Sequence, residues 1–196
     1  MESSLPLCPD VAVASLYQEY LVTRHTGRAV RLSIERLVEE RSGPSLTVID
    51  FREVAVIDFS CADEVVARLL HDTLSRPAHG ARHYFLLDGM EEGHIDPVSS
   101  ALERRGLAVA ARTVERRRIL LGRVEGEART VWEALSRAGQ SGAAALAERL
   151  NGDPAACARC LSRLDDRRLV RGVGDVYASL FTFLAQDDTG SGRDSE

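Results

Sequence analysis

The sequence predicts an α/β domain followed by a smaller helical domain, and three observations support this. Short apolar runs rich in β-branched residues alternate with segments whose apolar residues recur at helical spacing. The alternation weakens near residues 118–127, and three helical segments and a hairpin pattern follow. The chain has 196 residues, 44% of them hydrophobic, which is enough for two domains. We therefore expect an α/β domain over residues 1–122, a helical domain over 123–182 and a disordered polar tail over 183–196.

The first domain is expected to be a sheet covered by helices, because strands and helices interleave along it. The clearest helix has Asp96 as its N-cap, Pro97 in its first turn and Gly106 after its end. Other helices are expected at residues 26–40 and 60–74. The expected strands are residues 16–22, 46–51, 54–59, 83–89 and 107–111.

The second domain has the pattern of three short helices and a hairpin. Val131, Trp132 and Leu135 share one helical stripe, and residues 143–150 form a second helix. A third helix starts at Asp153-Pro154 and carries an apolar stripe. Two strand segments, residues 169–173 and 175–180, then meet across Gly174-Asp175.

Composition limits the function classes. The net charge is −5, and all 25 basic residues are arginine, so nonspecific coating of nucleic acid is not expected. No apolar run is long enough to span a membrane and no secretory signal is visible, so we expect a cytoplasmic protein without a membrane partner. Cys8, Cys61, Cys157 and Cys160 are too few and too scattered for a disulfide framework, and we expect reduced thiols.

The sequence offers no catalytic or cofactor motif. Cys157 and Cys160 have C-x-x-C spacing, but zinc needs four ligands and no second pair is present, so both are expected in the core. No phosphate-binding glycine loop or nucleophile elbow occurs. We therefore expect a protein that is not an enzyme and holds neither a metal nor a cofactor.

The junction from Asp58 to Glu64 is the most informative segment. Ser60 stands where the N-cap of a helix should be, with Asp63 three residues later, so the pair can simply cap the helix. The same position also suits phosphorylation, which adds about −1.5 to −2 charges. That charge would lie beside Asp58, Asp63 and Glu64, and would repel an acidic partner or reorganise the loop. Both interpretations are open.

Residues 50–60, DFREVAVIDFS, resemble the STAS family of sulfate transporters and anti-sigma-factor antagonists. They are more similar to the STAS-like branch of unknown function, with Ser60 followed by the acidic pair Asp63-Glu64 and with Arg24 and Gly27 upstream. The resemblance covers roughly residues 12–115. It implies a STAS-like mixed sheet and a non-catalytic recognition domain that partners a GHKL-type ATPase or a serine kinase. Ser60 would match the phosphorylated serine, although Phe59 and Cys61 replace the family's first serine and its glycine.

Residues 129–180 resemble bacterial winged helix-turn-helix domains. In such domains the third helix enters the DNA major groove, so Arg159 and Arg163 are candidate DNA contacts, with Arg171 on the wing. From Glu125 to Leu180, however, the sequence contains eight arginines and eight acidic residues, so this segment has no excess of positive charge. A winged helix used for dimerisation or for protein contact is an equally open alternative.

The two resemblances together predict a regulatory protein of the bacterial signalling type. A STAS-like domain would bind a protein partner, with Ser60 as a switch, and a winged helix would carry the output to DNA. The alternative is a pure protein–protein interaction module whose winged helix mediates homodimer formation or partner binding without DNA.

Overall fold

The computed structural model describes residues 10–17, 19–41, 43–75 and 82–189. They form two compact units. One runs from Ala12 to Val124, and the other comprises the residues from Glu125 onward together with the chain up to Val11, of which Asp10 and Val11 are described. This division lies two residues beyond the predicted boundary at 122. Cys8 lies outside the described residues.

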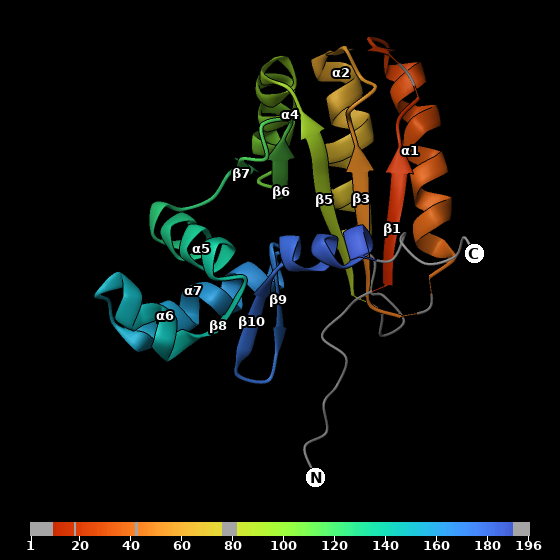
Figure 1. The fold of residues 1–196 in the computed structure, drawn as a ribbon. Helices are drawn as coiled ribbons and strands as arrows, with labels where there is room; N and C mark the ends of the chain where they lie inside the picture. Colours follow the sequence, from red (N-terminus) through yellow and green to blue (C-terminus); the bar gives the residue numbers. More distant parts are fainter. Residues whose placement is uncertain (1–9, 18, 42, 76–81, 190–196) are drawn as a thin grey trace, which may run out of the picture. The chain divides into compact units, whose positions relative to one another are not determined.

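The first unit contains a five-stranded mixed sheet with the order β1-β3-β5-β6-β7 (Figure 1). Strands β3, β5 and β6 are parallel, and β7 closes the sheet as an antiparallel edge strand. The predicted α/β architecture is therefore confirmed at this level. The strands are β1 (Asp10–Ser15), β3 (Ser45–Asp50), β5 (His83–Met90), β6 (Ala108–Thr113) and β7 (Arg118–Gly122).

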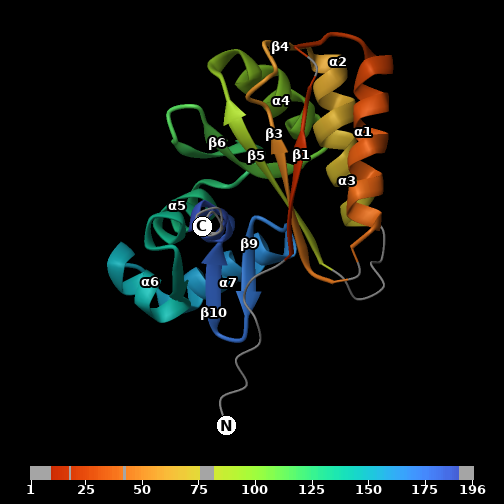
Figure 2. The same ribbon diagram turned by 45° about the vertical axis from the view of Figure 1, so that its right-hand side comes forward.

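Helices follow the strands and cover one face of this sheet (Figures 1 and 2). They contribute to one hydrophobic core with Ile49, Leu87 and Ala111, which are register neighbours on the central strands. Successive right-handed crossovers in one direction place every helix on the same face. The helices are α1 (Arg24–Glu39), α2 (Phe59–Ala62), the π-helix η1 (Asp63–Arg68), α3 (Leu69–Ser75) and α4 (Glu92–Arg104).

Two predicted strands of this unit are shorter than expected. Of residues 16–22 and 54–59, only β2 (Tyr20–Leu21) and β4 (Val56–Ile57) pair, as a small parallel ribbon. Conversely, neither β1 nor β7 was predicted. The arginine-rich start of β7 hides the apolar residues of that edge strand.

The start of α4 differs from the prediction. The N-cap is Glu91 rather than Asp96, and Pro97 lies inside the helix. The helix starts earlier because His94, in its first turn, accepts a hydrogen bond from the Glu91 backbone N–H through Nδ1 (3.1 Å). The predicted C-terminal glycine is confirmed, since Gly106 follows the helix with φ +66°.

The second unit has the predicted helices and hairpin, and a three-stranded antiparallel sheet in the order β8-β10-β9. The short strand β8 was not predicted. The elements are α5 (Gly126–Ala138), β8 (Gln140–Gly142), α6 (Ala143–Leu150), α7 (Pro154–Asp166), β9 (Val170–Val173), β10 (Val176–Ser179) and the 3-10 helix η2 (Leu180–Thr189).

Trp132 anchors the core of the second unit. Its side chain is 1% exposed, and its indole N–H donates a hydrogen bond to the Leu169 carbonyl (3.2 Å). Phe181 packs edge-on against it, with ring centroids 6.0 Å apart. Phe183 is also buried, so the predicted disordered tail does not begin at 183. Residues 190–196 lie outside the described residues.

Candidate functional site

The chain turns from β4 into α2 at Asp58, which is the N-cap of the helix. Asp58 has extended backbone angles, and its carboxylate accepts the Cys61 backbone N–H (2.8 Å). Ser60 lies in the first turn and donates its hydroxyl hydrogen to the same carboxylate (2.9 Å). The prediction that Ser60 caps the helix is therefore wrong, because the helix starts earlier and the longer acidic side chain occupies the cap.

Ser60 is partly exposed, and the pairing of β2 with β4 brings exposed apolar side chains to the same end of the unit. Tyr20 and Val56 are register partners in the β2–β4 ribbon and are 58% and 45% exposed. Val22 and Phe59 are exposed as well. We call Tyr20, Val22, Val56 and Phe59 the apolar patch. Large exposed apolar groups that gather together mark interaction surfaces more often than single ones do.

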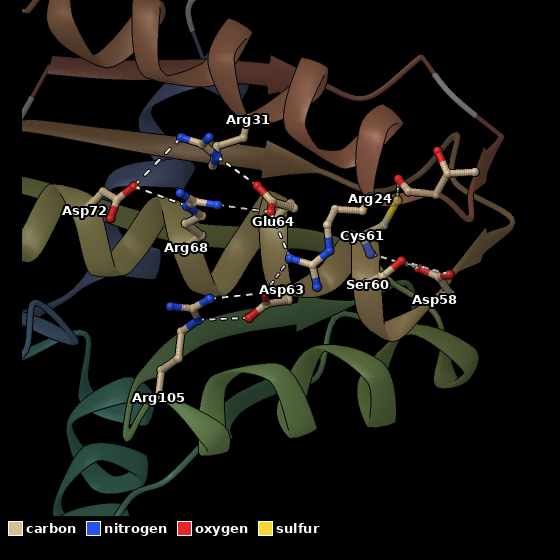
Figure 3. Close-up of polar contacts among 11 residues, drawn as sticks. Arg24, Arg31, Asp58, Ser60, Cys61, Asp63, Glu64, Arg68, Asp72 and Arg105 are labelled. Carbon is tan, nitrogen blue, oxygen red and sulfur yellow. Dashed lines mark hydrogen bonds and ion pairs between the residues drawn. The ribbon is translucent and has the colours of Figure 1, made fainter.

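Asp63 and Glu64 do not join Ser60 at the surface. They are 6% and 1% exposed and face arginines of α1, of η1 itself and of the end of α4, as Figure 3 shows. The sequence-based picture of Asp58, Asp63 and Glu64 as one acidic surface is therefore wrong for Asp63 and Glu64. Burying a carboxylate requires a compensating charge, and the arginines supply it.

Glu64 accepts hydrogen bonds from three arginines, two on α1 and one on η1 (Figure 3). Arg24 of α1 lies 3.0 Å from Oε1, Arg68 of η1 lies 3.2 Å from the same oxygen, and Arg31 of α1 lies 3.4 Å from Oε2. Arg31 also pairs with Glu35 and with Asp72, the latter at 3.8 Å. The carboxylate thus joins α1 to η1 from within.

Asp63 ties η1 to the end of α4. It accepts two hydrogen bonds from Arg105, at 2.9 and 3.1 Å, and Arg24 lies 3.5 Å away. Burial by itself would raise the pKa of this carboxyl, but the hydrogen bonds and charge of Arg105 and the charge of Arg24 outweigh it and lower the pKa.

The close approach of α1 makes this network possible. Gly27 of α1 lies over Cys61, and a Cβ there would be 3.0 Å from the Cys61 Cα and 3.1 Å from the Glu64 Cβ. The Cys61 thiol donates to the Thr23 carbonyl (2.8 Å), and burial raises its pKa. Cys61 is thus a packing residue between the two helices.

The network balances its charges. Its members are Arg24, Arg31, Arg68, Arg105, Glu35, Asp63, Glu64 and Asp72. Each carboxylate of the network is held by at least one guanidinium group. The cluster therefore ties α1, η1 and the end of α4 together through paired charges.

A second polar row crosses the carboxyl ends of the strands. Asp50 and Asp88 are register partners, and Arg112 donates two hydrogen bonds to Asp88 (2.6 and 2.7 Å). Arg52 binds Asp50 through Nε (2.9 Å) and through its backbone N–H (3.0 Å). Burial would raise the pKa of Asp50, but the hydrogen bonds and charge of Arg52 lower it. A shallow pocket of about 260 Å³ opens here, lined by Ser15, Leu16, Tyr17, Asp50, Arg52 and Glu53.

His94 is a buried residue that the sequence did not reveal as special. It is 0% exposed, its Nδ1 accepts the Glu91 N–H, and its ring lies 5.7 Å from that of Phe51. Burial lowers the pKa of this imidazole, so it is neutral at physiological pH. It closes the start of α4 and does not reach solvent.

The predicted DNA contacts in the second unit separate into two groups. Arg159 and Arg163 lie on the exposed face of α7, whose opposite face buries Cys157 and Cys160. The Arg163 guanidinium lies 3.4 Å from the carboxylate of Glu125. Arg171 on β9 is only 8% exposed, so the prediction that it contacts DNA from the wing is wrong. Its position on the strand turns its side chain inward.

The two cysteines of α7 lie in the core. Both are 5% exposed and carry free thiols, and burial raises the pKa of each. Within the described ranges, no group of three or more His, Cys, Asp or Glu side chains is placed to hold a metal ion. Among the same residues, no helix combines the length and apolar character that a membrane span needs.

Comparison of the chain with protein-family models and with curated proteins gives no match. The assignment of function therefore depends on the geometry of the chain itself.

Proposed function

We propose that this chain is a non-catalytic regulatory protein whose α/β unit binds a protein partner at the surface around Ser60. The observation that carries the proposal is the apolar patch of Tyr20, Val22, Val56 and Phe59, exposed next to a partly exposed hydroxyl. Apolar groups of this kind gain free energy when a partner covers them. The resemblance to STAS-like domains suggests a GHKL-type ATPase or a serine kinase as this partner.

Ser60 is the switch in this proposal. A phosphoryl group there would place about −1.5 to −2 charges next to the Asp58 carboxylate, which already accepts the Ser60 hydroxyl at 2.9 Å. Arg24, a nearby cation, is engaged by Asp63 and Glu64. Modification would therefore repel Asp58, loosen the start of α2 and release the partner.

This function can be tested by expressing the tagged chain in the cells from which the sequence comes and identifying the protein that co-purifies with it. We expect Phe59→Asp and Ser60→Asp to lose the same bound protein that the wild-type chain and Ser60→Ala retain. Leu32→Asp is the matched control, since Leu32 is 41% exposed on α1, outside the patch. If the wild type and Phe59→Asp retain equal amounts of the bound protein, the proposal is contradicted.

The second unit is proposed to be a winged helix that provides the output. Its helices α5, α6 and α7 with the β9–β10 hairpin are the parts of such a domain, and Arg159 and Arg163 lie exposed on α7. Arg171 is buried and Arg163 is paired with Glu125, which favours the second candidate, a winged helix that contacts protein and not DNA.

Selection of bound sequences from a random DNA pool distinguishes a winged helix that binds DNA from one that binds protein. If the winged helix binds DNA, the selection will enrich a particular sequence, and the affinity for it will fall as the salt concentration rises. The Arg159→Ala/Arg163→Ala variant will then bind this sequence more weakly than the wild type. Arg137→Ala is the control, because Arg137 is exposed on α5 and pairs with Glu133. Failure to enrich any sequence would leave the protein-interaction module.

A further inference from the structure

The turn between β6 and β7 is basic and exposed. Val114 is 47% exposed, and the side chains of Glu115 and Arg117 are 64% and 68% exposed. Arg116 and Arg118 are exposed too. We call residues 114–118 the basic tip. Three arginines against one glutamate give it an excess of positive charge in a chain whose net charge is −5.

Arg116 occupies a backbone position that favours glycine. Its φ is +64°, and the turn is closed by hydrogen bonds from the Arg116 N–H to the Thr113 carbonyl and from the Thr113 N–H to the Arg117 carbonyl, both 2.9 Å. A residue with a Cβ is strained in this conformation. The backbone geometry of the turn therefore does not require an arginine at this position, and glycine would adopt it with less strain.

An acidic surface lies at the other side of the same sheet edge. Glu19 and Glu53 are exposed, and Tyr17 and Tyr20 beside them are 84% and 58% exposed. The Glu19 carbonyl accepts the backbone N–H groups of Ala55 and Val56, which fixes this segment next to the loop after β3. We call Tyr17, Glu19, Tyr20 and Glu53 the acidic corner.

The sheet places the two surfaces at its carboxyl edge, on opposite sides. The Leu16 N–H donates to the Asp50 carbonyl at the end of β3, and the Val114 N–H donates to the Met90 carbonyl at the end of β5. The strand order puts β1 and β7 at the two margins (Figure 1). Neighbouring strands are about 4.8 Å apart, so four steps separate the margins by roughly 19 Å.

We infer that two copies of this chain associate through this edge about a two-fold axis. A two-fold operation exchanges the margins, so the basic tip of each copy meets the acidic corner of the other. Val114, Tyr17 and Tyr20 would be covered at both contacts. A nucleic acid is a poorer occupant, because the exposed Glu19 and Glu53 of the acidic corner would repel phosphate.

This inference does not depend on the partner proposed above, but the two surfaces share Tyr20. Self-association and partner binding would therefore compete. The contact would consist of exposed charged side chains and of the apolar side chains Val114, Tyr17 and Tyr20, so we expect a weak and reversible dimer.

Sedimentation equilibrium of the full chain tests the dimer directly. The wild type should dimerise with concentration, and added salt should weaken the association. Glu19→Arg/Glu53→Arg and Arg116→Glu/Arg117→Glu should each raise the Kd at least tenfold. An equimolar mixture of these two variants should associate again as a heterodimer, which only folded chains can do. A wild type that stays monomeric at about 1 mM, or a mixture that does not associate, overturns the inference.

The variant Arg116→Gly distinguishes an effect on the dimer contact of the basic tip from an effect on the stability of the turn. Glycine adopts positive φ readily, so the melting temperature should stay the same or rise, while the dimer Kd increases severalfold. Arg137→Ala, which removes one exposed arginine from α5, should leave the Kd unchanged. An unchanged Kd for Arg116→Gly would contradict the role given to the basic tip.

Discussion

Glu64 carries a negative charge in the interior of the α/β unit and receives three guanidinium groups there. We predict that Glu64→Gln lowers the free energy of unfolding by about 3 kcal/mol, because it leaves the buried Arg31, and the more exposed Arg24 and Arg68, without their common counter-charge. Urea denaturation followed by circular dichroism measures this. Glu103→Gln is the control, since Glu103 is exposed and accepts a hydrogen bond from the Ser99 hydroxyl (3.3 Å). A loss below about 0.5 kcal/mol for Glu64→Gln would show that the network adds little stability.

Asp63 makes the free energy of unfolding depend on pH. Its pKa in the folded chain lies below the ordinary value of 3.8, so its charged form stabilises the fold above about pH 4. This contribution is lost as the pH falls through the lowered pKa. We predict that Asp63→Asn costs about 1–3 kcal/mol at pH 7 and that the difference from wild type shrinks below pH 4. Unfolding curves between pH 2 and 7 check this, with the exposed Asp96→Asn as control; a difference independent of pH would contradict it.

At the scale of elements, Asp58 and Ser60 have different roles at the start of α2, because Asp58 is the N-cap and Ser60 is not. Asp58 accepts the Cys61 N–H, whereas Ser60 only donates to Asp58. Asp58→Ala should therefore lower the free energy of unfolding by about 1 kcal/mol, and Ser60→Ala by less than about 0.5 kcal/mol. Thermal and urea unfolding of both variants decide this. A larger loss for Ser60→Ala than for Asp58→Ala would restore the serine as the cap.

The elements that the sequence predicted well are those whose signals are local. Asp153 and Pro154 are adjacent, and the structure confirms them as the N-cap and first residue of α7. The network was not predictable in this way, because Glu64 meets Arg31 across 33 residues and Asp63 meets Arg105 across 42. Asp63 and Glu64 look like surface residues in the sequence, and only the packing of α1 and α4 reveals their partners.

Local signals also misled where they competed. Asp96-Pro97 is a strong helix start, yet α4 begins at Glu92 because His94 satisfies the backbone at Glu91. Arg171 follows a wing-like sequence pattern but is buried. Which face of a short strand points inward depends on the neighbouring strands, and a pattern of four residues does not determine it.

At the scale of the whole molecule, the two units should be separable. The only tryptophan, Trp132, is buried within the unit that begins at Glu125, so its emission reports on that unit alone. We predict that a fragment from Glu125 to the C-terminus unfolds cooperatively, with an emission shift on exposure of Trp132. Leu135→Ala, at a position that is 0% exposed, should lower its stability by about 2–5 kcal/mol. Tryptophan emission that is already solvent-exposed in the native fragment would contradict separability.

The order β1-β3-β5-β6-β7 is also the order of the strands along the chain. Each strand of the main sheet therefore joins the strand that precedes it, and no strand must be inserted between two that have already paired. Such a topology keeps contact order low for a largely parallel sheet. The α/β unit can consequently be assembled progressively from its amino-terminal margin while the ribosome is still synthesising the remainder.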